Sequence, residues 1–192
     1  MNIQFKPLQS DFYSQPALEV APLLLGKIVH CNNVSLIITE TEAYLPSDSA
    51  CHAYKGKTDR NSPMFKCGGI LYVYLCYGIH HLCNVVVDRE GVASAVLLRA
   101  AQVYAGEQVV RERRKGRLNL VGPGKVGQAL NLTPQDSGRT LSGDVVITEG
   151  FSPAKIDTAP RVGIEYALPR DRDAHWRFIA NEFTDYKRSQ GA

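Results

Sequence analysis

The sequence predicts a single α+β domain in which helices surround a curved antiparallel β-sheet and one β-hairpin protrudes from that sheet. Three observations support this prediction. The strand-like segments are joined by turns too short for the crossover that parallel strands require. The helical segments lie outside the strand-rich middle of the chain. The length of 192 residues and the hydrophobic content of 44% suit one domain with a buried core.

We expect the domain to cover residues 1–183 and residues 184–192 to form a polar C-terminal tail that frays. Within the domain, residues 14–26 are typical of a short helix, with Ser14 as its cap, Pro16 in its first turn and Gly26 as its stop.

Two strands, at 27–31 and 34–44, follow this helix and flank the pair Asn32-Asn33, which predicts a tight β-hairpin. The long polar stretch at 45–68 is then expected to be a loop, and loops of this length in a compact domain are usually functional or disordered.

The middle and end of the chain alternate between apolar segments and turns. Strands are predicted at 69–77 and 80–87, around Gly78, and a third is predicted at 92–100. Helices are predicted at about 103–115 and in the glycine-rich segment 122–130, and short strands at 145–150, 161–164 and 175–179.

Composition excludes several classes of protein. No apolar run reaches the eighteen residues that a membrane span needs, and the N-terminus does not resemble a secretory signal. The five cysteines are an odd number without a C-x-x-C pair, which argues against a disulfide framework and favours a cytoplasmic protein with reduced thiols. The net charge of +3 and the pI near 8.6 are compatible with a polyanionic partner but do not demand one.

The stretch that points most clearly to chemistry is Glu-Thr-Glu-Ala-Tyr at 40–44. Period-two alternation places Glu40, Glu42 and Tyr44 on one face of a strand, together with aliphatic residues that precede them. Such a face is typical of a pocket at the mouth of a sheet. The alternative is that both glutamates are solvated at a strand end, and alternation does not choose between Glu40 and Glu42 as a reactive carboxylate.

A run of tyrosines at 72–77 is the second candidate. Tyr72 and Tyr74 share a face, and a purely structural role in the core would explain both. Tyr77 lies on the opposite face beside Gly78, where an aromatic side chain has little core to join. It could act as a wedge between base steps of a nucleic acid.

Several motifs in this order resemble the alkyladenine (3-methyladenine) DNA glycosylase family. They are ETEAY at 40–44, CHAYKGKTDRNSPMF at 51–65, LYVYLCYGIHHLCN at 71–84, VLLRA at 96–100 and GPGKVGQAL at 122–130. The similarity runs from about Pro16 to Phe178, and the chain lacks the extension that precedes the domain in vertebrate members, which suggests the microbial type. Ile79 and Cys67 depart from the family pattern, which leaves the packing behind the hairpin tip open.

The resemblance implies roles for individual residues. It makes Glu42 the general base and assigns Arg99 and the backbone of Val162 to the attacking water. It implies that Tyr44, His52 and Tyr74 hold the flipped base and that Asn84 screens its exocyclic groups. The remaining DNA contacts are Tyr77, which would fill the gap in the duplex, its neighbours Gly78, Ile79 and His80, and the backbone-binding candidates Thr58, Arg60, Asn61 and Lys125.

The implied activity is removal of alkylated or deaminated purines from double-stranded DNA. The substrates would include 3-methyladenine, 7-methylguanine, hypoxanthine and ethenoadenine. The base is first extruded, and one ionised carboxylate then activates water, as in inverting glycoside hydrolysis. Because no lysine matches the pocket, we expect a monofunctional enzyme that leaves an abasic site for base excision repair.

Other interpretations of these residues remain open. The segment 122–130 also resembles the hairpin of helix-hairpin-helix glycosylases, which would be mostly helical, and it could simply be a Gly-Pro helix start. The basic cluster at 111–117 is either a solvated helix end or a DNA-binding patch. His80 and His81 lack zinc-ligand spacing, so we expect no metal and no cofactor. The alternative function is a damaged-base binder without catalysis, and a monomer is the default.

Overall fold

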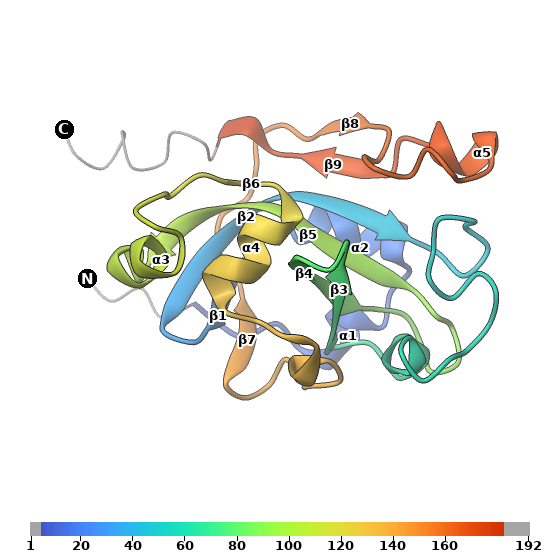
Figure 1. The fold of residues 1–192 in the computed structure, drawn as a ribbon, viewed down its shortest axis with the longest axis horizontal. Helices are drawn as coiled ribbons and strands as arrows, with labels where there is room; N and C mark the ends of the chain where they lie inside the picture. Colours follow the sequence, from blue (N-terminus) through green and yellow to red (C-terminus); the bar gives the residue numbers. More distant parts are fainter. Residues whose placement is uncertain (1–4, 183–192) are drawn as a thin grey trace.

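Two long antiparallel strands, paired with each other, form the centre of the protein. The structure is a computed structural model that describes residues 5–182. Nine strands of these residues form one antiparallel sheet with the main order β3-β4-β5-β2-β1-β7, which confirms the predicted α+β class (Figure 1). The strands are β1 (Ile28–Cys31), β2 (Val34–Tyr44), β3 (Ile70–Cys76), β4 (His80–Val86), β5 (Ala95–Ala105), β6 (Leu120–Val121), β7 (Val145–Thr148), β8 (Asp157–Ala159) and β9 (Arg177–Ile179).

Strand β2 changes partner along one of its edges. Its first half pairs with β1, and its second half, from Glu40 to Glu42, pairs with β9. On its other edge β2 pairs with β5 over its whole length, with register shifts on both sides of Glu40. Such bulges raise the local twist of a strand. The glutamate segment therefore lies between β5 and β9, beside two of the register shifts of β2.

Short helices cover the sheet on two sides. The helices are α1 (Ser10–Tyr13), α2 (Ala17–Leu23), α3 (Glu107–Arg113), α4 (Pro123–Leu130) and α5 (Pro169–Arg172), with 3-10 turns at Ser62–Phe65 and Pro134–Asp136. Helix α2 buries Ala17, Val20 and Ala21 against β2, where the Thr41 hydroxyl donates a hydrogen bond to the Ala21 carbonyl. Helix α4 packs on β4 and β5. In the described part of the chain, no helix has the length and apolar character that a membrane span requires.

The β3–β4 hairpin protrudes, as predicted. Three side chains near its tip, Leu75, Tyr77 and Ile79, are 44%, 85% and 74% exposed. Tyr77 adopts a φ of 50° and Gly78 a φ of 72°, so two consecutive residues of the turn are left-handed, which is uncommon for a non-glycine residue. The hairpin packs closely against α4 at Gly124. A Cβ on this glycine would come within 2.7 Å of the His80 ring.

Most predicted elements are present, with shifted bounds. The Asn32-Asn33 hairpin, the helix of the first segment and the helix at 122–130 are confirmed as β1–β2, α2 and α4. The predicted start of the other helix at 103 is wrong, because the strand predicted at 92–100 begins at Ala95 and runs to Ala105. Gly106 separates strand from helix in a left-handed conformation, with φ 81°, where a Cβ would meet the Asn33 carbonyl oxygen.

The strand predicted at 161–164 is also wrong. These residues form a loop, and the strand that pairs with β9 is instead β8, which the sequence prediction missed. The Val162 N–H donates to a carboxylate and not to a strand ladder, which explains the absence of a strand there. The predicted tail at 184–192 lies outside the described residues.

Candidate active site

A cavity of about 590 Å³ opens between the β3–β4 hairpin, the loop that follows β2 and the loop at 161–166. Its size falls within the range of 300–1,000 Å³ that is typical of small-molecule sites. The wall combines aromatic, polar and cationic side chains, and the predicted site residues Tyr44, His52, Arg60, Tyr74, Tyr77, His80, Asn84, Arg99, Lys125 and Val162 all line it.

Glu42 lies directly behind this wall and is fully buried. One carboxylate oxygen, Oε1, accepts a hydrogen bond from the Val162 N–H at 3.0 Å, and the other, Oε2, accepts one from the Tyr44 hydroxyl at 2.9 Å. The Arg99 Nε lies 3.5 Å from Oε1. Because all three partners line the cavity, the carboxylate stands one layer of side chains away from the space that a ligand would occupy.

The two glutamates of β2 differ in their partners. Glu40 Oε1 accepts a hydrogen bond from Arg99 at 2.7 Å and another from Arg177 at 2.9 Å, so two guanidinium groups neutralise it. Among the described residues, Glu42 has the more distant Arg99 contact besides its two neutral donors. The alternative of two solvated glutamates is wrong, since Glu40 is 7% exposed and Glu42 not at all. Glu40 is therefore placed to anchor Arg99, whereas Glu42 has a single, more distant guanidinium contact.

Burial raises the pKa of Glu42 above its ordinary value of 4.5. Arg99, the Val162 N–H, the Tyr44 hydroxyl and Arg161 oppose this shift, because each stabilises the charged form. A carboxylate whose pKa is raised in this way is a stronger base than a solvated one while it remains ionised.

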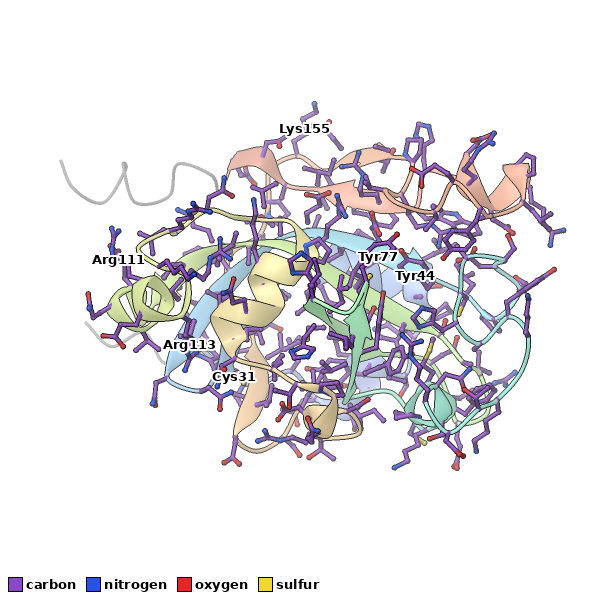
Figure 2. The ribbon with its side chains drawn as sticks, in the orientation of Figure 1. Cys31, Tyr44, Tyr77, Arg111, Arg113 and Lys155 are labelled. Atoms are coloured by element: carbon purple, nitrogen blue, oxygen red, sulfur yellow. The ribbon has the colours of Figure 1, made fainter. Side chains whose placement is uncertain are left out.

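Tyr44 is held from two directions. Its hydroxyl is on Glu42, and the Arg161 guanidinium lies over its ring at 4.6 Å from the centroid. One face of the ring is therefore occupied by a cation, and a ligand in the cavity could contact only the rest of the ring. Figure 2 shows Tyr44 near the end of β2, with Tyr77 on the neighbouring hairpin.

Three aromatic side chains, those of His52, Tyr72 and Tyr74, form another part of the cavity wall. The His52 Nδ1 is hydrogen bonded to the Tyr72 hydroxyl at 2.8 Å, and its ring meets the Tyr74 ring edge-on, with centroids 4.4 Å apart. Burial and the nearby Arg60 lower the pKa of His52, which favours the neutral imidazole near pH 7. A neutral imidazole would not repel a cationic ligand, as an imidazolium would. Tyr72, for which the sequence offered only a structural role, orients His52.

Asn84 and Arg60 complete this wall. The Asn84 side chain is 4% exposed and donates a hydrogen bond to the Tyr72 carbonyl, which fixes the amide at the cavity surface. Arg60 lies over the Tyr74 ring at 5.4 Å and donates to the Leu75 carbonyl. Arg60 thus lines the cavity itself.

The other residues predicted to contact the DNA backbone have different positions. Lys125 is exposed at the start of α4, beside the cavity. Asn61 is 2% exposed, and its amide donates to the carbonyls of His52 and Gly56, so its side chain holds the loop and does not reach the surface. Its Oδ1 accepts the backbone N–H of Thr58, which is itself exposed.

The basic cluster of α3 lies away from the cavity. Figure 2 places Arg111 and Arg113 at the end of the molecule remote from Tyr44 and Tyr77. Arg113 donates to the carbonyls of Ala129 and Asn32, so it has an internal structural role. Arg113 therefore fits neither interpretation of the cluster, because its guanidinium is bound to carbonyl groups of the protein itself.

The histidine and cysteine residues near the hairpin do not converge. His80 packs on Gly124, whereas Cys83 is completely buried in the main core. Among the described residues no three His, Cys, Asp or Glu side chains gather as potential metal ligands. All five cysteines are free thiols.

Comparison with known proteins identifies the family. A model of the methylpurine-DNA glycosylase family matches residues 11–183. This chain belongs to that family. The family membership agrees with the motif resemblance and excludes the helix-hairpin-helix alternative, which the sheet-rich fold also contradicts.

Similar proteins in plants and bacteria extend this result for the glycosylase. It is 46% identical to a DNA-3-methyladenine glycosylase of Arabidopsis thaliana, over 91% of this chain and 72% of the relative. A protein of Nitrosococcus oceani is 46% identical over 88% of both chains, and one of Chlorobaculum tepidum is 44% identical over 91% and 88%; both carry the same activity in provisional names.

The sequence prediction missed several residues of the glycosylase site. Asp48 and Arg161 form a fully buried ion pair behind the cavity, and Tyr166, 70% exposed, stands at its rim with its hydroxyl 3.4 Å from the Ala50 carbonyl. No periodicity marks these positions. The one available signal was adjacency, since Arg161 directly precedes Val162 in the motif RVGI.

Proposed function

We propose that this protein is a monofunctional 3-methyladenine DNA glycosylase. It would extrude an alkylated or deaminated purine from duplex DNA and hydrolyse its N-glycosidic bond with water activated by Glu42. The observation that carries this proposal is a buried, hydrogen-bonded carboxylate directly behind an aromatic-walled cavity that is large enough to admit a purine. Family membership and the names of the relatives support the coarser assignment.

The cavity suits an electron-poor base. Tyr44, His52 and Tyr74 present aromatic surfaces to it, and contact with such surfaces contributes about 1–3 kcal/mol per base. Alkylation that leaves a positive charge on the purine strengthens the attraction to aromatic faces. Asn84 would then discriminate between bases through their exocyclic groups.

The chemical step needs one carboxylate and one water. As the bond between the base and C1′ lengthens, its electron pair leaves with the base and the sugar becomes positively charged. The ionised Glu42 stabilises this charge and removes a proton from the water, whose oxygen forms the new bond to C1′. We propose that water reaches Glu42 at the wall formed by Val162 and Arg99. A base that is already cationic leaves without further protonation.

Imine chemistry at the sugar is not part of this proposal. A lysine nucleophile must lose its proton, which usually requires desolvation or a neighbouring cation. Lys125 borders the cavity but is exposed, and no other lysine of the described residues lines it. The product is therefore an abasic site in an intact strand.

The proposal is tested by single-turnover assays on labelled duplexes that contain hypoxanthine, ethenoadenine or 7-methylguanine. We expect release of the free base, strand scission only after hot alkali, and no covalent adduct with borohydride. Tight binding of lesion duplex without any base release would instead identify a non-catalytic damage-binding protein, and a borohydride adduct would show a lysine nucleophile.

Tyr77 at the hairpin tip is proposed to fill the space that the extruded base leaves. Replacing Tyr77 with alanine is expected to weaken binding of a lesion duplex by about tenfold, because unstacking a base step costs a few kcal/mol and only part of it is then returned. Binding of a duplex with an abasic analogue, already unstacked, should change less. The matched control is Tyr54→Ala, which removes a tyrosine that is 42% exposed outside the cavity lining. Equal losses for both duplexes would argue against intercalation.

A further inference from the structure

We infer that Arg161 is a positioning residue for the hydrolysis, because one guanidinium holds in place both groups that donate hydrogen bonds to Glu42. This inference rests on the proposed function and assigns a task to a residue outside the predicted site. Arg161 itself does not contact Glu42 by a hydrogen bond. It acts through Tyr44 and through the loop that carries Val162.

The side chain of Arg161 is completely buried and joins separate parts of the chain. It donates hydrogen bonds to both carboxylate oxygens of Asp48, whose side chain is equally buried. It also donates to the Ala43 carbonyl at 2.9 Å and to the Asp171 carbonyl at 3.1 Å. Arg161 therefore fastens the end of β2, the loop after it and α5 to its own loop.

The guanidinium of Arg161 also contacts the ring of Tyr44. The Arg161 Cζ lies 4.6 Å from the centroid of Tyr44 and 4.9 Å from that of Trp176, so the cation contacts both rings. The Tyr44 hydroxyl is 2.9 Å from Glu42 Oε2. Because the Ala43 carbonyl and the Tyr44 ring are held by the same group, the direction of this hydroxyl follows from the position of Arg161.

The second donor to Glu42 depends on Arg161 through the main chain. Val162 follows Arg161 directly, and its N–H is 3.0 Å from Glu42 Oε1. A loop residue outside any strand has no ladder to fix its amide, and here the buried ion pair does so. The cation and the two donors meet Glu42 from three elements: β2, β5, which carries Arg99, and the loop at 161–162.

The charged groups around Glu42 determine the direction in which its pKa would change if Arg161 were replaced. Arg99 and Arg161 favour the carboxylate, whereas burial disfavours it. Glu40 shares Arg99 and is itself bound by Arg177 from β9. If Arg161 no longer holds Tyr44 and Val162, Glu42 loses two hydrogen bonds to its charged form while burial remains. Its pKa must then rise, and the fraction of active base at a given pH falls.

The test is the pH dependence of single-turnover excision by Arg161→Lys, with saturating enzyme and a duplex that contains 7-methylguanine. Lysine keeps the positive charge but loses the planar fork that binds Asp48 and stacks on the rings. We expect the maximum rate per active molecule to be about 10²-fold lower, because a small misplacement of a catalytic group lowers the rate by about this factor. We also expect the acidic limb of the profile to move to higher pH.

Two controls distinguish an effect on the position of Tyr44 and Val162 from a loss of folded protein. The active fraction is counted by titration with a duplex that contains an abasic analogue, and Ile147→Ala, a fully buried change on β7, provides a destabilised reference. That variant should keep the wild-type rate per active molecule and the wild-type acidic limb. Asp48→Asn, which removes the partner's charge and keeps its shape, should shift the limb in the same direction as Arg161→Lys.

The inference would be overturned if Arg161→Lys and Asp48→Asn both kept the wild-type excision rate and the wild-type acidic limb of the pH profile. It would also be overturned if both variants had a smaller active fraction but an unchanged rate per active molecule. Glu42→Gln, measured beside them, distinguishes a failure of the proposed function from a failure of the role assigned to Arg161. Full excision by Glu42→Gln would refute the proposed function, whereas an inactive Glu42→Gln protein beside a wild-type Arg161→Lys protein would refute only the role of Arg161.

Discussion

Replacing Glu42 with glutamine is expected to lower the single-turnover rate of base excision by about 10²–10⁴-fold while lesion binding persists. Glutamine has nearly the same volume, and its carbonyl oxygen can still accept the Val162 N–H that now binds Oε1. It carries no charge to stabilise the sugar and removes no proton from water. The effect should therefore appear in the rate at saturating enzyme, with little change in the affinity for lesion duplex.

Glu40→Gln is the matched control for this prediction. It makes the same chemical change two residues away on β2, but Glu40 is already bound by Arg99 and Arg177. We expect a smaller loss of rate, since only the position of Arg99 is affected. If Glu40→Gln were the inactive protein and Glu42→Gln the active one, the assignment of the base within ETEAY would be reversed.

Replacing Asp48 with alanine is expected to lower the free energy of unfolding by about 3–5 kcal/mol, because it leaves the buried guanidinium of Arg161 without its counter-charge. For a chain of this size, a loss on this scale lowers the melting temperature by roughly 10 °C. The measurement is thermal unfolding followed by circular dichroism, with denaturant titration for the free energy.

Asp157→Ala provides the comparison for the stability prediction. Asp157 pairs with Lys155 at the surface, where their side chains are 42% and 79% exposed, and such pairs contribute about 0–1 kcal/mol. Equal melting temperatures for Asp48→Ala and Asp157→Ala would show that burial of the Asp48–Arg161 pair has no energetic consequence. We expect a large loss of the free energy of unfolding for Asp48→Ala and a small one for Asp157→Ala.

The sequence was sufficient for those parts of the fold that depend on local pattern. Alternation placed Glu40, Glu42 and Tyr44 on one face, and the structure agrees, because Arg99 reaches both glutamates and Tyr44 bonds to Glu42. The turn at Asn32-Asn33 was predictable from its residues alone. The start of α3 was not, since the strand before it continues until the left-handed Gly106 ends it.

Several contacts of the site join residues far apart in the chain, and no local sequence pattern predicts them. Glu42 differs from Glu40 through an N–H that lies 120 positions along the chain and through the two arginines that neutralise Glu40. The pair Asp48–Arg161 joins residues 113 positions apart, and in the sequence each is one charged residue among many. Motif order could point to Val162 but not to the buried arginine beside it. Contacts of this range become visible only when the chain is folded.

The central claim, that an ionised Glu42 activates the water, is tested most directly by the pH dependence of wild-type excision beside that of Glu42→Gln. A duplex with 7-methylguanine is the substrate of choice, because its cationic base needs no proton to leave. Burial raises the pKa of Glu42, so the wild-type rate should fall as the pH drops through a value above 4.5. The Glu42→Gln protein should show a low rate without this limb. An equally high rate and the same acidic limb in both proteins would contradict the claim.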